Sequence, residues 1–202
     1  MKLRDQQLAL TRTTILDALA AEITENGLVD LSIQAVADRA GVTHRTVYNH
    51  FPTRQALNDA FAEHVEALLA TQALEPVNTS VDDWPQVAID SQAIFSLRPE
   101  HLRAYAMLTI ATGAPASVFR NRSKRMAKAL QGELGLDPAT ARLVVSAIRM
   151  FMSSAGWFLM SAHHGLSSAE IGRVSAWAIR TLIDTARSGD VPMPTNKEVK
   201  HG

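Results

Sequence analysis

A single glycine separates two short helical patterns in the stretch SIQAVADRAGVTHRTVYNHF, which runs from Ser32 to Phe51. Ser32 and Thr43 are typical N-cap residues, because their side-chain oxygens accept hydrogen bonds from the first free N–H groups of a helix. Gly41 lies between the patterns and tolerates the left-handed backbone that ends a helix sharply. The stretch therefore predicts two short helices joined by a tight turn, a helix-turn-helix.

The second of these helices has two chemically different faces. Val47 and Phe51 are four residues apart and are expected to face a core. At 100° per residue, a strip roughly 140° wide on the opposite side holds His44, Arg45, Tyr48 and Asn49. Arginine can bind guanine with two hydrogen bonds, and asparagine can bind adenine in the same way, so this face is suited to base edges. Groups at its margin or in the first turn of the next helix are placed to reach phosphates: Thr43, Tyr48, His50 and Arg54.

Charge is unevenly distributed along the chain, although the formal net charge is zero. No acidic residue lies between Asp38 and Asp59, whereas Arg39, Arg45 and Arg54 all fall in this interval. A local positive potential favours binding to DNA. The alternative, for any short helical hairpin, is a polar face that only contacts water.

The rest of the chain has helical periodicity, without strand alternation or internal repeats. The sequence predicts an all-α fold of about nine helices, in which an N-terminal three-helix helix-turn-helix domain is joined by a connecting helix to a C-terminal helical bundle. Beyond the helix that stops at Asn26-Gly27 and the two short helices, the expected helices are 53–71, 84–97, 100–112, 116–134, 138–164 and 167–188. The last of these begins with a capping box made by Ser167 and Glu170.

A polar, proline-containing link, EPVNTSVDD, occupies residues 75–83 and is expected to end the rigid coupling between two parts of the chain. We predict a helix-turn-helix DNA-binding domain at 1–55 and a ligand-binding and dimerisation domain at 56–188. Residues 189–202 are expected to form a flexible tail.

Several classes of protein are disfavoured. The chain has no cysteine, which excludes disulfides and thiolate metal sites. No secretory signal follows the first residues, so we expect a cytoplasmic protein. Residues 143–162 are long and apolar enough to span a membrane, but Arg149 and four serines interrupt them, and we interpret them as a helix buried in protein.

No catalytic motif, phosphate loop or nucleotide-binding fingerprint is present, so neither an enzyme nor a cofactor is predicted. His163 and His164 are adjacent, and neighbouring side chains on a helix point about 100° apart, so no metal site is predicted there. The basic segment 120–128 is interpreted as a solvated helix face.

The segment from Thr11 to Phe61 resembles the DNA-binding domain of the TetR family of bacterial transcriptional regulators. An ordered set of motifs carries the similarity: G-L-x-x-L-S, then V-A-x-x-A-G-V-T across the turn, then V-Y-x-H-F with a basic residue three positions later. Ile23 stands where the family frequently has an aromatic residue, and Arg54 where it usually has lysine. The resemblance implies a second, all-helical domain for ligand binding and dimerisation, although that part of the chain carries no matching motif.

Carried over position by position, the resemblance places one set of side chains toward bases: Gln34, His44, Arg45 and Asn49. Gln34 is added by the resemblance alone. The resemblance places a second set toward phosphates: Thr43, Tyr48, His50 and Arg54.

Methionine and aromatic side chains recur in the C-terminal part and are predicted to line a pocket for a small apolar effector. The set, which includes one arginine as a polar anchor, is Trp84, Phe95, Tyr105, Met107, Phe119, Met126, Arg149, Met150 and Trp157. Ordinary core packing is the alternative for most of them. Arg149 pairs with a carboxylate such as Asp90 or Asp184, pairs across a dimer, or anchors an acidic ligand.

Small and apolar residues in the last two helices predict a four-helix homodimer interface: Ser153, Gly156, Leu159, Ile171, Val174, Ala178 and Leu182. The complete prediction is a transcriptional repressor that binds a palindromic operator as a dimer and is released by a small apolar effector. The alternatives are a ligand-independent DNA-binding activator or architectural protein and, less favoured, an enzyme.

Overall fold

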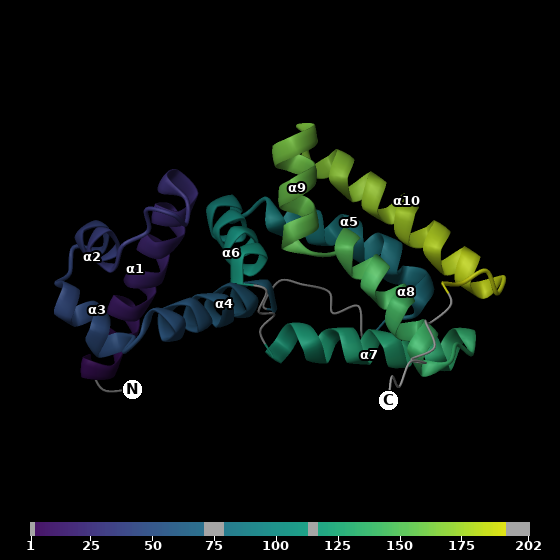
Figure 1. Cartoon of the computed structure of the whole chain (residues 1–202), viewed down its shortest axis with the longest axis horizontal. Coiled ribbons are helices and arrows are strands. Elements are labelled where there is room, and N and C mark those ends of the chain that lie inside the picture. Colours follow the sequence, from purple (N-terminus) through teal and green to yellow (C-terminus); the bar gives the residue numbers. More distant parts are fainter. Residues whose placement is uncertain (1–2, 71–78, 113–116, 193–202) are drawn as a thin grey trace, which may run out of the picture. The chain divides into compact units, whose positions relative to one another are not determined.

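The computed structural model describes residues 3–70, 79–112 and 117–192. These residues form ten α-helices and a short 3-10 helix, with no strand among them (Figure 1). In chain order the helices are α1 (Leu3–Asn26), α2 (Ile33–Ala40), α3 (His44–His50), α4 (Arg54–Ala70), η2 (Val81–Asp83), α5 (Trp84–Phe95), α6 (Pro99–Thr112), α7 (Ser117–Leu134), α8 (Pro138–Phe151), α9 (Ser154–His164) and α10 (Ser168–Arg187). The predicted all-α fold is confirmed.

The chain divides into two compact units. The first unit comprises Met1–Ala73 and Ala93–Ala116, and the second comprises Leu74–Gln92 and Ser117–Gly202. The first unit is larger than the predicted DNA-binding domain, because α4 and α6 pack against α1. The functional boundary at residue 55 stays a prediction.

Helix α1 is the central element of the first unit. It packs against α2, α4 and α6, while α2 contacts α3 and α4 contacts α6. Ile15, Leu19 and Ile23 of α1 are completely buried, and their four-residue spacing keeps them on one face of the helix. One helix therefore supports both the helix-turn-helix and the pair formed by α4 and α6.

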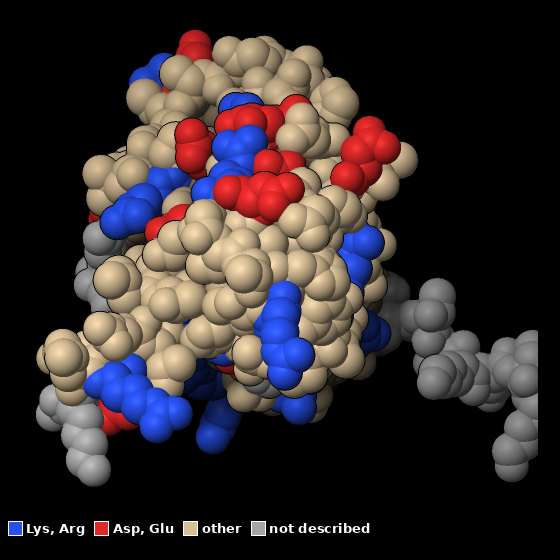
Figure 2. Space-filling model, turned by 90° about the vertical axis from the view of Figure 1, so that its left-hand side faces the viewer, with Lys and Arg blue, Asp and Glu red and all other residues tan. Residues whose placement is uncertain are grey.

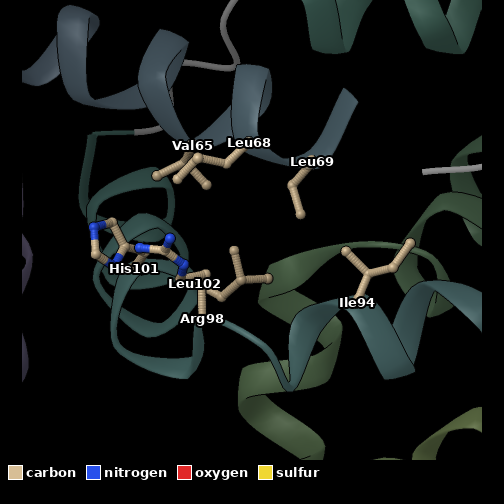
Figure 3. Close-up of a pocket in the computed structure, with 7 residues that line it drawn as sticks. All are labelled: Val65, Leu68, Leu69, Ile94, Arg98, His101 and Leu102. Carbon is tan, nitrogen blue, oxygen red and sulfur yellow. The ribbon is translucent and has the colours of Figure 1, made fainter. Parts of the chain in front are cut away.

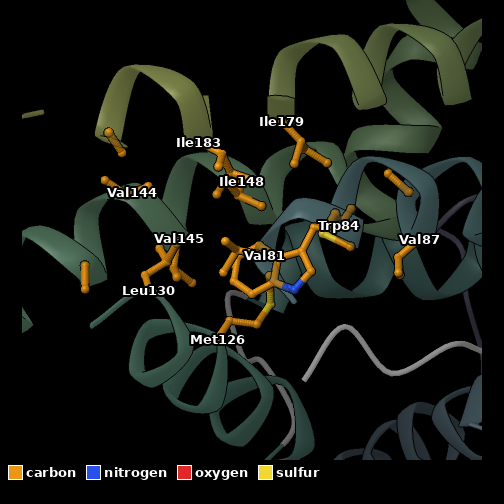
Figure 4. Close-up of a cluster of buried hydrophobic side chains, with 14 residues drawn as sticks. Val81, Trp84, Val87, Met126, Leu130, Val144, Val145, Ile148, Ile179 and Ile183 are labelled. Atoms are coloured by element: carbon orange, nitrogen blue, oxygen red, sulfur yellow. The ribbon is translucent and has the colours of Figure 1, made fainter. Parts of the chain in front are cut away.

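The second unit is built around a continuous apolar cluster (Figure 4). Its buried members come from η2, α5, α7, α8, the residue that follows α8, and α10: Val81, Trp84, Val87, Ala88, Met126, Leu130, Ala141, Val144, Val145, Ile148, Met152, Ile179, Ile183 and Ala186. Trp84 is completely buried and contributes the largest side chain of the cluster. Helix α10 begins with the predicted capping box, in which Glu170 and Ser167 cap each other.

The prediction of one long helix over 138–164 is wrong. The chain leaves helical geometry at Met152 and Ser153, and α8 and α9 meet at a bend of 48°. Ser153 is extended and caps α9, because its Oγ accepts a hydrogen bond of 3.0 Å from the Gly156 N–H. The apolar pattern continues across the break, which explains both the merged prediction and a helix count of about nine in place of ten.

Among the described residues, no single helix is long and apolar enough to cross a membrane. The bent pair α8 and α9 meets that criterion only when its two helices are taken together.

Some predictions fall outside the described residues. They concern Thr71 at the end of the fourth helix, the first part of the polar link (75–78), the side chain of Phe119 and most of the tail (193–202). Within the described part of the link, Val81–Asp83 form η2 in place of the expected irregular segment.

Candidate nucleic-acid interface

The predicted helix-turn-helix is formed by α2 and α3. Ser32 Oγ accepts a hydrogen bond of 3.0 Å from the Ala35 N–H and caps α2. Gly41 has φ of 66° and ends α2 in the left-handed region, where a side chain would be strained. Thr43 Oγ1 accepts a bond of 3.1 Å from the Thr46 N–H and caps α3. The turn thus follows from side-chain caps and one glycine, as the sequence indicated.

Helix α3 has only seven residues and is held by two buried apolar side chains. Val47 and Phe51 expose 1% and 2% of their surface. The Arg12 guanidinium of α1 lies 4.5 Å from the centre of the Phe51 ring, a cation–π contact that adds to the packing. Because Val47 and Phe51 face inward, the opposite side of α3 faces solvent.

That solvent face carries the side chains predicted to read bases. His44, Arg45 and Asn49 are exposed. Gln34 of α2 is also exposed, and its Nε2 donates a hydrogen bond of 2.7 Å to Asp38 Oδ1 on the same helix. The structure therefore brings three of the four residues together on α3 and the fourth onto α2, with Gln34 engaged by Asp38. Contact with bases stays a prediction for all four.

The predicted phosphate contacts lie around the same face. Thr43 is exposed, and its Oγ1 lies 2.8 Å from Thr46 Oγ1. Tyr48 is 42% exposed and its ring lies 4.8 Å from that of His44, which restrains both side chains. Arg54 is exposed at the first position of α4, and His50 is half-buried at the end of α3. Their roles at phosphates also stay predictions.

Arg39 does not contribute the positive charge that its sequence neighbourhood suggests. Its Nε donates a hydrogen bond of 2.6 Å to Glu22 Oε1, and its two terminal nitrogens bond both carboxylate oxygens of Glu25. The bond from Arg39 lowers the pKa of the Glu22 carboxyl, and the two glutamates raise the pKa of Arg39. No acidic residue lies between Asp38 and Asp59 in the sequence, but two glutamates of α1 contact Arg39 in the structure.

Figure 2 views the face of the molecule that lies on the left of Figure 1. Acidic and basic side chains adjoin in the upper part of this face, while basic groups are more widely spaced in its lower part. Within the described residues, neither Arg45 nor Arg54 forms an ion pair. The positive charge available to a phosphate backbone therefore comes from side chains such as Arg45 and Arg54, not from Arg39.

The residues predicted to line an effector pocket are distributed over both units. Phe95, Tyr105 and Met107 belong to the first unit, and the other described members belong to the second. Trp84 and Met126 are completely buried in the apolar cluster, so they serve as core.

The remaining members of this set have different surroundings. Arg149 and Trp157 are buried, whereas Met150 is 55% exposed. Tyr105 is buried and its hydroxyl donates a hydrogen bond of 2.9 Å to Glu66 Oε1. The pocket predicted from these residues stays a prediction.

A cavity that the sequence analysis missed lies within the first unit, between α4, the end of α5 and the start of α6 (Figure 3). Its empty volume is about 340 Å³, part of which is open to solvent. It is lined by Val65, Leu68, Leu69, Ile94, Arg98, His101 and Leu102. Leu57, Phe61, Val65 and Leu68 recur at helical spacing, which predicts a buried face on α4, but nothing in the sequence indicates that Arg98 and His101 face the same space.

The residues predicted to form a dimer interface also differ in accessibility. Ile171 and Ala178 are buried within the chain, at 0% and 8% exposure, and do not belong to an open surface. A Cβ added to Gly156 would lie 1.9 Å from the Met150 carbonyl oxygen, so this glycine serves the bend between α8 and α9.

Part of the predicted dimer set remains on an accessible surface. Leu159 and Val174 are each 37% exposed, Leu182 and Ser153 are half-buried, and Trp177, which was not predicted, is 68% exposed. Trp177 lies three residues after Val174 on α10, a spacing that places both on one helix face. In the basic segment, Lys124, Arg125 and Lys128 are exposed, as a solvated face requires.

The segment that contains the helix-turn-helix matches a known protein family. Residues 15–61 match the model for "Bacterial regulatory proteins, tetR family". This range covers most of α1, all of α2 and α3, and the start of α4. No curated protein sequence is similar enough to this chain to count as a match.

Solved structures match almost the whole chain. A TetR family transcription regulator from Marinobacter aquaeolei VT8 has a TM-score of 0.63 at 17% identity, over 91% of this chain and 97% of that one. A putative TetR-family transcriptional regulator from Rhodococcus sp. has a TM-score of 0.64 at 19% identity, over 86% and 98%. TetR-Q116A from Acinetobacter baumannii AYE, solved in complex with minocycline, has a TM-score of 0.58 at 21% identity, over 88% and 97%. At these identities the matches show a shared fold.

Proposed function

We propose that this protein is a transcriptional repressor that binds a palindromic operator as a homodimer. The support is the match of residues 15–61 to the tetR family model and the fold that the whole chain shares with solved TetR-family regulators. The observation that carries the proposal is the two-faced helix α3. Val47 and Phe51 anchor it, and Arg45 and Asn49 are left exposed on its other side. These are the side-chain types that bind guanine and adenine with paired hydrogen bonds.

Arg45 and Arg54 have different proposed roles, and the difference can be measured. Arg45 reads a base, so Arg45→Ala should weaken operator binding by about 1–3 kcal/mol and relax the preference at one base pair. Arg54 contacts a phosphate, so Arg54→Ala should weaken binding to operator and to random DNA alike.

The test is a fluorescence anisotropy titration of full-length protein against a selected operator and a shuffled duplex at one salt concentration. Arg142→Ala is a matched control, because Arg142 is an exposed arginine on α8 in the other unit. An equal loss on both duplexes for Arg45→Ala would remove the base-reading role.

A homodimer supplies the second reading helix, because one short helix contacts only one half-site. The proposed contact surface is the exposed apolar face of α9 and α10, which includes Leu159, Val174 and Trp177. An exposed tryptophan of this kind is a common anchor in protein interfaces. Trp177→Lys should convert the dimer to a monomer in light scattering. A wild-type chain that is monomeric at micromolar concentration and still binds its operator would contradict the proposal.

The proposed effector is a small, largely apolar molecule bound in the cavity of the first unit. Five of the seven lining residues are aliphatic, and Arg98 offers a charged group to an acidic substituent. The solved structures with this fold include a multidrug binding protein, EbrR, complexed with imidazole, at a TM-score of 0.56 and 19% identity. That likeness supports a ligand-responsive chain without identifying its ligand.

Helix α4 provides the mechanical link between effector and DNA. It begins with Arg54 and continues to Val65 and Leu68 at the cavity. The proposed phosphate contact and the proposed effector site therefore lie on one helix. Eleven residues of helix separate Arg54 from Val65 by about 16 Å at a rise of ~1.5 Å per residue. A ligand that displaces the cavity end moves the Arg54 end and weakens DNA binding by its difference in affinity for the two states.

Leu68→Trp tests this mechanism, because the larger side chain fills the cavity. The variant should bind the operator and lose its response to compounds that stabilise the wild-type protein in thermal-shift screens. If stabilising compounds leave the operator affinity of the wild type unchanged, a ligand-independent DNA-binding role is the better description. A regulator of this kind acts on chromosomal DNA, so the proposal places it in the bacterial cytoplasm.

A further inference from the structure

Three side chains from three helices of the first unit converge at one point. Asp17 comes from α1, His64 from α4 and His101 from α6. His101 Nε2 lies 2.8 Å and His64 Nε2 lies 3.8 Å from the same atom, Asp17 Oδ1. One potential ligand atom of each side chain lies within 4.8 Å of the other two. None of these residues belongs to the DNA-reading face.

We propose that Asp17, His64 and His101 form a binding site for a divalent transition-metal ion of the zinc type. Two imidazole nitrogens and one carboxylate oxygen are the protein ligands of many zinc sites with an open fourth position. Zinc lies about 2.0–2.2 Å from such atoms, which places tetrahedral neighbours about 3.3 Å apart. The observed separations of 2.8 and 3.8 Å lie on either side of that value. The ligand atoms of the two histidines lie within 4.8 Å of each other, so the three side chains must still move to bring all three separations close to that value.

A hydrogen bond between His101 and Asp17 explains part of this arrangement without a metal. It does not include His64, whose Nε2 lies 3.8 Å from the same carboxylate oxygen, beyond hydrogen-bond distance. Phe61 stacks near His101 at 6.3 Å between ring centres, which limits the movement of that ring.

The charges around the cluster set the expected strength of binding. Asp17 supplies one negative charge, while the positive charges of Arg12 and Arg98 act on His64 and oppose any further cation. The three-ligand site should therefore bind its ion moderately, and removing a nearby positive charge should strengthen binding. Arg98 is exposed, so Arg98→Gln is expected to fold normally.

An ion at this position would fasten α1 to both α4 and α6. His101 also lines the cavity, so one of the three proposed ligands borders the space assigned to the effector. The metal site depends only on these three side chains and stands whether or not the chain regulates transcription.

The experiment is a calorimetric titration of metal-free, full-length protein with Zn²⁺, followed by Co²⁺ absorption spectroscopy. One ion should bind per chain, and Co²⁺ should give the intense visible absorption of a tetrahedral site. Asp17→Asn and His64→Gln, which preserve side-chain size, should each weaken binding at least tenfold. Arg98→Gln should strengthen it. The double variant His163→Ala/His164→Ala is the control, because it removes the two exposed neighbouring histidines of α9 and should leave binding unchanged.

Circular dichroism and the thermal midpoint without metal verify that each variant is folded, and a misfolded variant is replaced by His64→Asn. Zn²⁺ should raise the thermal midpoint of the wild type and leave that of His64→Gln unchanged. The proposal is overturned if the wild type binds no Zn²⁺ at ten times its own concentration, or if only the His163/His164 variant loses binding. Both readouts are made without DNA, so their failure is distinct from failure of the proposed repressor function.

Discussion

The first unit joins its helices partly through polar side chains, whereas the second unit joins its helices around a continuous apolar cluster. In the first unit, His101 of α6 bonds Asp17 of α1, Tyr105 of α6 bonds Glu66 of α4, and Arg39 of α2 bonds two glutamates of α1. In the second, the bonds between elements include the exposed pair of Arg187 and Asp82 and a partly buried bond from the Val81 N–H to Glu133, both at the edge of the apolar cluster's elements.

The difference indicates where a switch is to be expected. Close-packed apolar cores resist rearrangement, because any shift loses many contacts at once. Hydrogen bonds and ion pairs between helices are directional and few. A bound ligand or ion can therefore replace one of the two bonded side chains. The cavity and the cluster of Asp17, His64 and His101 both lie in the unit with polar ties. We therefore expect regulation to act through the first unit, with the second as a rigid support.

The largest effect should come from removing the centre of the apolar cluster. Trp84→Ala leaves a cavity in the second unit and should lower the free energy of unfolding by about 3–5 kcal/mol, measured by urea denaturation. Trp177→Ala removes the same side chain from an exposed position and should cost much less. Any loss for Trp177→Ala should depend on protein concentration if that residue lies in a dimer interface. Similar losses for both variants would refute the assignment of Trp84 as core.

The next largest effect concerns the bend between α8 and α9. Gly156→Ala places a Cβ 1.9 Å from the Met150 carbonyl oxygen, so the backbone must move, at a cost of about 1–3 kcal/mol. Gly132→Ala is the control, because a Cβ there meets nothing within 4 Å and α7 is helical at that point. That control should stabilise the protein by about 0.5–1 kcal/mol. Thermal unfolding of both variants gives the comparison, and a neutral Gly156→Ala would mean that the bend relaxes easily.

A smaller effect should follow from cutting one polar tie of the first unit. Tyr105→Phe removes the hydroxyl that donates to Glu66 and should cost about 1 kcal/mol, because the carboxylate loses a donor on a half-buried side chain. Tyr48→Phe removes the other tyrosine hydroxyl of the chain from an exposed position and should leave the urea midpoint unchanged. If both variants are neutral, the tie between α4 and α6 does not contribute to stability.

The smallest effect should be a change in pH dependence. Arg39 lowers the pKa of Glu22 in the folded state, so ionised Glu22 stabilises the fold at neutral pH. This contribution is lost as the pH falls below 4.5, the ordinary value for a glutamate, and through the lower folded value. Glu22→Gln should lower the thermal midpoint at neutral pH and show a shallower decline in acid. Parallel curves for the two proteins would show that the pair with Arg39 has no energetic role.

Features governed by neighbouring residues were predictable. The caps at Ser32, Thr43 and Ser167 and the helix stop at Gly41 all occur as the sequence indicated. Each depends on bonds between residues a few positions apart, so the local sequence contains every atom that matters. The same reasoning failed at Ser153, which is the N-cap of α9. The apolar helical pattern continues on both sides of this serine, so the sequence predicted that it lies inside one long helix.

Features that join distant segments were not predictable. The charge of Arg39 is paired with glutamates that lie 14 and 17 residues earlier in the chain. Ile171 and Val174 are three residues apart in the predicted apolar seam, yet one is completely buried and the other is 37% exposed. Helical periodicity identifies an apolar face but not which neighbour covers it.

The sequence by itself determined the caps of α2 and α3, the turn between them and the polar side chains that α3 exposes, because all of these follow from residues within about one or two helical turns of each other. Only the tertiary structure decided that Asp17 and His101, 84 positions apart, would lie in hydrogen-bond contact, and that Arg98 and His101 would share a cavity with α4. The physical reason is that such contacts depend on how whole helices pack, and packing is set by the combined shape of many side chains.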